Sequence, residues 1–229
     1  ASFRRYFRLI TDKGVSYIVM DAPPEKEDCR AYLAVGMVLR NIGVNAPCVH
    51  DLDLDKGFIL LDDFGSEDYL QVLKPDNADR LYRDAFTALA KIQSEGPTDE
   101  ETFESYDRKK LIDEMSLFHE WLLQKHYHLV LDEDDHFLLD QTYQFLADVA
   151  LEQPRVLVHR DYHSRNLMHL ASNNPGILDF QDALIGPITY DVVSLLKDCY
   201  ISWPRERVVS WMGDYYSRPK VQRLISGIS

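Results

Sequence analysis

The chain contains few cysteines, little basic charge and no long apolar run. Its 229 residues include three cysteines, an odd number without metal-site spacing, so we expect reduced thiols rather than disulfides. Acidic residues outnumber basic ones by 38 to 25, and the net charge of -13 argues against a nucleic-acid or anionic-membrane partner. The longest apolar segments, such as residues 58–61, are far too short to span a bilayer, and no basic region precedes an apolar one as in a secretory signal. We therefore expect a cytoplasmic protein.

The most informative motif lies at residues 159–166, which read His-Arg-Asp-Tyr-His-Ser-Arg-Asn. Asn166 follows Asp161 by five positions, and Asp179 follows Asn166 by thirteen. This order resembles the catalytic loop of the protein-kinase-like fold, in which the first aspartate accepts the proton of the acceptor hydroxyl. The asparagine and the second aspartate of that pattern hold magnesium, an ion that prefers oxygen ligands. The spacing therefore predicts Asp161 as the catalytic base and Asn166 and Asp179 as metal ligands.

The residues around the motif agree with a loop followed by a hairpin. Residues 155–158 read as a strand entering the loop, residues 167–170 as a strand leaving it, and residues 172–176 as a tight turn. A hairpin at this place would aim Asn166 and Asp179 at one point. Each of these residues alone also fits an ordinary structural role, and an inactive pseudokinase with the same architecture would carry the same motif.

Two further segments extend the resemblance. The catalytic loop, residues 178–183 and residues 186–191 look like the aminoglycoside phosphotransferase and choline kinase superfamily. Residues 1–8 and 17–29 are similar, more narrowly, to the bacterial anomeric sugar kinases that phosphorylate N-acetylmuramate and N-acetylglucosamine during cell-wall recycling. The resemblance implies ATP and Mg2+ as cofactors and the hydroxyl of a small sugar as the acceptor. The alternatives are an aminoglycoside or other small-molecule phosphotransferase and a nucleotide-binding pseudokinase.

The expected fold is α+β with two lobes. We predict a nucleotide-binding lobe with an antiparallel sheet over residues 1–62 and a helical catalytic lobe over residues 63–229, with both chain ends incomplete. Strands are predicted at 3–10, 15–20, 48–52 and 57–61, and helices at 31–39, 79–93, 111–123 and 137–149. We expect the aromatic residues of the last three helices in the core. Residues 218–221 have the appearance of a junction between segments that are not adjacent in a longer chain.

The small lobe departs from the usual kinase pattern. Met20 stands about where a kinase strand carries the lysine that pairs with the nucleotide phosphates. Our hypothesis is that Arg4, Arg5 or Arg8 supplies the missing charge, because a guanidinium pairs well with phosphate. The competing interpretation is that these arginines decorate an exposed strand.

The remaining site residues are predicted from position. No G-x-G-x-x-G glycines are present, so backbone N–H groups at Ser2 and Phe3 would have to cradle the phosphates, together with Arg4 and Arg5. Adenine is expected beside Leu60, Leu61 and Asp62. The candidates for acceptor contact are His163, Arg165, Gln181 and Asp182. His159 and Asp191 are expected to support the loop.

Overall fold

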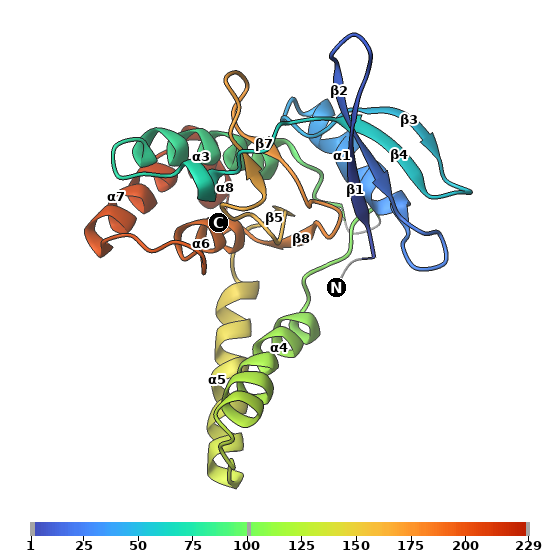
Figure 1. The fold of residues 1–229 in the computed structure, drawn as a ribbon. Helices are drawn as coiled ribbons and strands as arrows, with labels where there is room; N and C mark the ends of the chain where they lie inside the picture. The colour runs from blue at the N-terminus through green and yellow to red at the C-terminus, as the bar shows by residue number, and fades with distance from the viewer. Residues whose placement is uncertain (1–2, 100–101, 228–229) are drawn as a thin grey trace.

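The computed structural model describes residues 3–99 and 102–227. It has two lobes joined by a short crossing segment, and Figure 1 shows the sheet of the smaller lobe beside the helices of the larger one. The predicted α+β architecture, with an antiparallel sheet in the small lobe and a mainly helical large lobe, is confirmed. The small lobe is an antiparallel sheet in the order β1-β2-β4-β3, and its elements are β1 (Arg5–Ile10), β2 (Ser16–Asp21), α1 (Cys29–Asn41), β3 (Val49–Asp53) and β4 (Phe58–Asp62).

The first hairpin places Met20 in the interior of the small lobe. Gly14 closes the turn with a φ of +76°, a conformation that glycine adopts without a steric cost. In the resulting register Met20 lies between Tyr6 of β1 and Ile59 of β4, and its side chain is fully buried. The position at which the resemblance leads us to expect the strand lysine is therefore part of the apolar core.

The large lobe is built around one long helix. Its elements are α2 (Tyr69–Val72), α3 (Ala78–Glu95), α4 (Arg108–Leu117), the π-helix η1 (Phe118–His126), α5 (Glu133–Leu151), β5 (Arg155–Val158), β6 (Leu167–Met168), β7 (Gly176–Ile177), β8 (Leu184–Pro187), α6 (Tyr190–Leu196), α7 (Arg205–Tyr216) and α8 (Pro219–Ser226). Helix α3 packs against β5, α6, α7 and α8, and its apolar residues recur at helical spacing on the buried side. Strands β5 and β6, which belong to the two small antiparallel sheets β5-β8 and β6-β7, flank residues 159–166.

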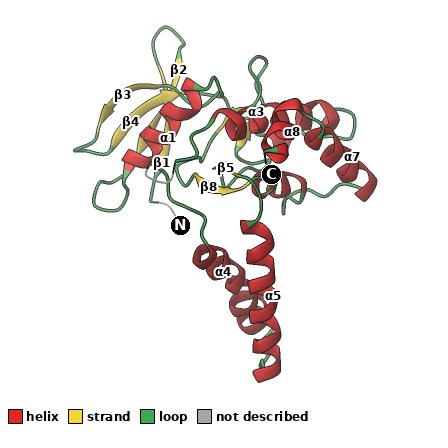
Figure 2. Cartoon of the chain, turned by 180° about the vertical axis from the view of Figure 1, so that it is seen from behind, coloured by secondary structure: helices red, strands yellow, loops and turns green. Residues whose placement is uncertain are grey.

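Helices α4, η1 and α5 form a hairpin that projects away from the rest of the large lobe (Figure 1, Figure 2). The prediction of core aromatics is confirmed in α3, where Tyr82 and Phe86 are buried. In this hairpin it holds for Tyr143, which is buried, and is wrong for Trp121, which is 57% exposed, and for Phe137, which is 67% exposed. The reason is that α4 packs mainly on α5 and η1, so among the described residues no further layer covers one side of the hairpin. Helical periodicity identified these helices but not what they pack against.

The lobes meet at the end of β4. Residues 63–65 follow Asp62 and lead to the helical part of the chain, and we keep the division after residue 62 as a proposal. In the segment at 218–221, Arg218 ends the short link between α7 and α8, and residues 219–221 form the first turn of α8; both helices pack against α3. Among the residues that the structure describes, no helix is long and apolar enough to cross a membrane.

Candidate active site

The catalytic loop begins with a sharp turn that a buried carboxylate holds in place. The backbone N–H groups of His159 and Arg160 donate to the two oxygens of Asp191 at 2.8 and 3.0 Å. Arg160 has a φ of +76°, which is uncommon for a residue with a side chain and is tolerated where the surroundings fix it. Asp191 lies in the first turn of α6 and is fully buried. The structure thus places Asp191 where it supports the loop, as expected from the resemblance.

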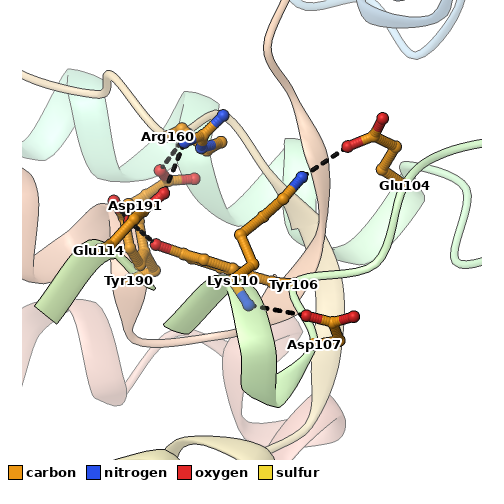
Figure 3. A network of polar contacts seen from close by, with 8 residues as sticks. All are labelled: Glu104, Tyr106, Asp107, Lys110, Glu114, Arg160, Tyr190 and Asp191. Carbon is orange, nitrogen blue, oxygen red and sulfur yellow. Dashed lines mark hydrogen bonds and ion pairs between the residues drawn. The ribbon is translucent and has the colours of Figure 1, made fainter. Parts of the chain in front are cut away.

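The side chain of Arg160 ties the loop to the base of the projecting hairpin. Its Nη2 donates to Glu114 of α4 at 2.6 Å, and the hydroxyls of Tyr106 and Tyr190 contact the other oxygen of the same carboxylate. Figure 3 shows this network, with Asp191 beside Arg160. Glu114 therefore joins α4, the catalytic loop and the start of α6.

His159 links the catalytic loop to the segment that carries Asp179. The N–H of Asp161 donates to the Nδ1 of His159 at 3.2 Å, and the Nε2 of His159 lies 3.0 Å from the carbonyl oxygen of Leu178. A carbonyl only accepts, so the proton is on Nε2 and the ring is the neutral tautomer. Burial lowers the pKa of His159 to about 4. A neutral imidazole with both nitrogens bonded is a structural brace.

The buried imidazole predicts a pH-dependent stability. Because the unfolded chain takes up a proton near pH 6.5 and the folded chain only near pH 4, this group favours folding above pH 6.5 and loses that contribution as the pH falls toward 4. The loss amounts to at most about 3 kcal/mol. Urea unfolding of the wild type and His159→Gln at pH 4.5 to 7.5 measures it. The stability advantage of the wild type should shrink toward low pH, and a constant difference would contradict the assignment.

The β6–β7 hairpin brings Asn166 and Asp179 to the same pocket. Leu167 pairs with Ile177, and the N–H of Leu178 donates to the carbonyl of Asn166 at 2.9 Å. The side-chain Nδ2 of Asn166 donates to the carbonyl of Asp161 at 2.9 Å. This bond engages the amide nitrogen of Asn166 and leaves its amide oxygen, an acceptor, without a hydrogen bond among the described residues.

Asp161 is half-buried next to these residues. Its pKa is raised above the usual value of 3.8 by burial first and by the nearby charge of Asp179 second. Such a carboxylate is a stronger base than an exposed one, which suits it to accept a proton. The structure therefore gathers the three residues that the spacing predicted.

A cavity of about 360 Å³ lies between the lobes at this point. Asn166 and Asp179 line one end, and residues of the sheet and the crossing segment line the other. Phe180, fully buried, stacks on Tyr32 of α1 with ring centroids 4.8 Å apart, so the segment after Asp179 packs directly on the small lobe. The residues lining the cavity are Tyr6, Ile18, Tyr32, Pro47, Leu61, Asp62, Asp63, Phe64, Gly65, Asn166, Met168, Leu178 and Asp179.

Sequence reasoning located only part of this cavity. Leu61 and Asp62 line it, whereas the side chain of Leu60 faces a shallow hollow beside Val19 on the other face of the sheet. The strand alternation explains the difference, because successive side chains point to opposite faces. The same alternation was the signal that would have found Ile18, which pairs with Leu61. The N–H of Asp62 already donates to the carbonyl oxygen of Cys48. An adenine in the cavity would therefore have to form hydrogen bonds with backbone groups of the residues after Asp62.

Three arginines lie in β1 or directly before it, and each has a different partner. Arg4 forms an ion pair with Glu27 at 3.0 Å, and both side chains are about 11% exposed. The charge of Asp179 also acts on the Arg4 guanidinium. Arg5 pairs with Asp21 and its side chain is 67% exposed. Arg8 binds the crossing segment through Asp63 and the carbonyl of Gly65. Of these three arginines, Arg4 is thus the one on which the charge of Asp179, a candidate metal ligand, acts.

The candidate phosphate loop, residues 2–5, is described from Phe3 onward. The backbone N–H of Phe3 donates to Glu27 at 2.6 Å, so the same carboxylate holds both Phe3 and Arg4. Ser2 lies outside the described residues. Glu27 itself was not predicted, because no local pattern marks a partner twenty-three positions away.

The four acceptor candidates flank the catalytic residues in two groups. Gln181 donates to Asp179 at 2.9 Å and to Asp182 at 3.1 Å, and its buried Oε1 has no partner among the described residues. His163 and Arg165 lie on the other side, beside Tyr200. The structure therefore places all four near the loop without a common point of contact.

The donor set at the pocket fits a hard divalent cation. Mg2+ usually binds through one or two carboxylates, with waters and substrate phosphates completing the shell. One carboxylate, Asp179, and one amide oxygen, that of Asn166, meet this requirement. Within residues 3–99 and 102–227 there is no group of three or more His, Cys, Asp or Glu side chains that would form a closed protein-only metal site.

Comparison with curated proteins finds relatives of one kind. The chain is 46% identical over 218 residues to an N-acetylmuramate/N-acetylglucosamine kinase of Pseudomonas putida and 45% identical to the enzyme of that name from Pseudomonas aeruginosa. Both alignments cover 95% of this chain but 63% of the relative, so the chain spans less than two thirds of their length. A relative of the same name from Neisseria meningitidis is 38% identical, over 98% of this chain and 67% of its own length.

Solved structures with the same fold are more distant in sequence. The ADP-bound aminoglycoside phosphotransferase APH(2'')-Ib has a TM-score of 0.64 at 20% identity, covering 98% of this chain and 80% of that chain. The gentamicin complex of APH(2'')-IIa has a TM-score of 0.65 at 18% identity, with the same coverage. A model of the phosphotransferase enzyme family matches residues 1–223. Because this match extends over almost the whole chain, the chain belongs to the phosphotransferase enzyme family.

Proposed function

We propose that this chain is the catalytic part of an ATP-dependent kinase that phosphorylates the anomeric hydroxyl of N-acetylmuramate and N-acetylglucosamine in cell-wall recycling. The observation that carries the proposal is that Asn166 and Asp179 line the interlobe cavity with Asp161 beside them, in a chain 46% identical to a kinase of that name. We propose the cytoplasm as the location of the reaction, because ATP is the donor.

The chemistry needs one proton acceptor and positive charge at the phosphates. The anomeric oxygen attacks the γ-phosphorus, the bond to the β–γ bridging oxygen breaks, and ADP leaves. Asp161 accepts the hydroxyl proton, for which its raised pKa is suited. Mg2+, held by Asn166 and Asp179, would neutralise charge on the phosphates. Neither metal ligand has to accept or donate a proton, so proton transfer is left to Asp161.

The nucleotide would occupy the cavity with its base toward the sheet. Tyr32, Leu61 and Phe64 supply apolar surface, and the other end meets the metal ligands. Arg4 is the residue that best replaces the strand lysine, because it lies close to Asp179 and is oriented by Glu27. The Arg4–Glu27 ion pair would then take the place of the lysine–glutamate ion pair that kinases usually have.

Arg4→Ala is expected to raise the Michaelis constant for ATP about tenfold or more, since a charge-assisted contact to phosphate is lost. Arg5→Ala is the matched control, because Arg5 is exposed and pairs with Asp21 away from the cavity. Its constants should stay within about twofold of the wild type. Steady-state kinetics with varied ATP measures both. Equal effects of the two substitutions would remove Arg4 from the nucleotide site.

A second candidate is an aminoglycoside or other small-molecule phosphotransferase, which the acidic composition favours because such acceptors are cationic. A third is a nucleotide-binding pseudokinase, which the buried Met20 favours. ADP release by the full-length protein, measured with N-acetylmuramate, N-acetylglucosamine and a cationic aminoglycoside, separates them. Turnover of an N-acetyl sugar supports the proposal, turnover of the aminoglycoside alone supports the second candidate, and tight ATP binding without turnover supports the third.

A further inference from the structure

Three side chains form a cluster next to the catalytic loop and outside the interlobe cavity: His163, Arg165 and Tyr200, here called the acceptor cluster. The rings of His163 and Tyr200 lie 5.5 Å apart, edge to face, and the guanidinium carbon of Arg165 lies 5.0 Å from the centre of the Tyr200 ring. None of the three lines the cavity assigned to the nucleotide. A ligand of the acceptor cluster is therefore a different molecule or a different part of the substrates.

Asp198 builds this cluster from two distant segments. One of its carboxylate oxygens accepts from the N–H of Ser164 and the other from the N–H of Tyr200, each at 2.9 Å. The first bond fixes the catalytic loop, and the second fixes the chain that follows α6. The position of Tyr200 over the loop is thus set by backbone hydrogen bonds and not by surface packing alone.

The acceptor cluster has unused polar capacity. Among the described residues Arg165 makes no ion pair with a carboxylate, and its contact is with the ring of Tyr200. The Nδ1 of His163 is buried and has no hydrogen-bond partner in the described part of the chain. Tyr200 is 47% exposed. A guanidinium, an imidazole and an accessible aromatic ring together suit a ligand with an apolar face and an anionic group.

The acceptor cluster is adjacent to the group that receives the acceptor proton. The N–H of His163 donates to the carbonyl of Asp161 at 3.1 Å, and Arg165 immediately precedes Asn166 in the chain. The charge of His163 also acts on the carboxyl of Asp161, and Tyr200 joins His163 to Arg165. A sugar whose hydroxyl meets Asp161 would therefore lie beside His163, with the other two side chains of the cluster next to it. The cavity on the other side of Asn166 is left to the nucleotide.

We infer that the acceptor cluster is a subsite for the carboxylate of an acidic sugar, so that Arg165 recognises the lactyl group that N-acetylmuramate carries and N-acetylglucosamine lacks. Tyr200 provides the face for the sugar ring that the two share, and His163 contributes a polar contact. The inference rests on the proposed function and adds the basis on which the site distinguishes its two acceptors. Arg165 is the residue that determines this preference.

The test compares both sugars in the full-length protein with Arg165→Gln and Arg165→Lys. Arg165→Gln should raise the Michaelis constant for N-acetylmuramate about tenfold or more, since a charged pair is lost, and change that for N-acetylglucosamine by less than about twofold. Arg165→Lys keeps the charge without the two-pronged geometry and should recover part of the loss. Arg80→Gln is the control, an exposed arginine on α3 that pairs with Asp84.

Three results would overturn the inference while the proposed function stands. They are an equal loss for both sugars, no loss for either, and a loss expressed mainly in the Michaelis constant for ATP, which would move Arg165 to the nucleotide side. If the wild-type protein phosphorylates neither sugar, the proposed function fails, and this inference fails with it.

Discussion

Asp161→Asn is expected to lower turnover by about a thousandfold, within the range typical of lost general-base catalysis. The amide has nearly the shape of the carboxylate, so the loop should keep its structure, but it does not accept the proton of the sugar hydroxyl. Asp161 does not line the cavity assigned to ATP, and the dissociation constant for ATP should therefore stay within about threefold. Rapid-quench turnover and isothermal titration with ATP measure the two quantities separately.

The control for this substitution is Asp113→Asn. Asp113 lies on the exposed side of α4, where it pairs with Lys109 one helical turn away. Exposed pairs of this kind contribute little to stability, so kinetics should match the wild type. Near-normal turnover of Asp161→Asn would show that another group takes the proton, and a parallel loss of ATP binding would show that the substitution disturbs the site as a whole.

Asp179→Ala should have the second large effect. The substitution removes the single carboxylate among the two proposed metal ligands, so Mg2+-dependent ATP binding should weaken by about ten- to a hundredfold and turnover should fall further. The effect on turnover exceeds that on binding because the charge on the phosphates grows in the transition state. Binding of ATP titrated at several Mg2+ concentrations separates loss of the metal from loss of the nucleotide.

Two observations would assign Asp179 a structural role instead. One is an unchanged dependence of ATP binding on Mg2+, and the other is a large loss of thermal stability in the variant without ligands. Asp179 has a φ of +59°, an uncommon conformation for a residue with a side chain. Asparagine adopts this left-handed backbone conformation readily, so Asp179→Asn should fold as the wild type does. It should therefore reproduce the loss of metal dependence without a loss of stability.

The catalytic hairpin was predictable because its geometry is local. Asn166 and Asp179 are joined by two short strands and a turn, so their spacing along the chain largely determines that they meet. The elements of the small lobe were predictable for the same reason, and their observed ends differ from the predicted ones by a few residues or less. Strand ends depend on the last hydrogen bonds of a ladder, which sequence patterns do not resolve.

The partners brought together by tertiary structure were not predictable. Glu27, in the segment before α1, contacts Arg4 from twenty-three positions away, and Asp198 reaches Ser164 from thirty-four positions away. Apolar periodicity likewise identified α5 but gave no sign that Phe137 would remain exposed. In each case the contact depends on which elements pack together, information that no single segment contains.

The central claim is the position of the new phosphate, and phosphorus NMR of the product tests it most directly. The full-length protein would be incubated with ATP, Mg2+ and either N-acetylmuramate or N-acetylglucosamine, with Asp161→Asn as the blank. The account predicts a sugar phosphate whose phosphorus couples to the anomeric proton and is absent from the blank. A phosphate on any other hydroxyl, or no sugar phosphate while the same preparation phosphorylates a cationic aminoglycoside, would contradict it.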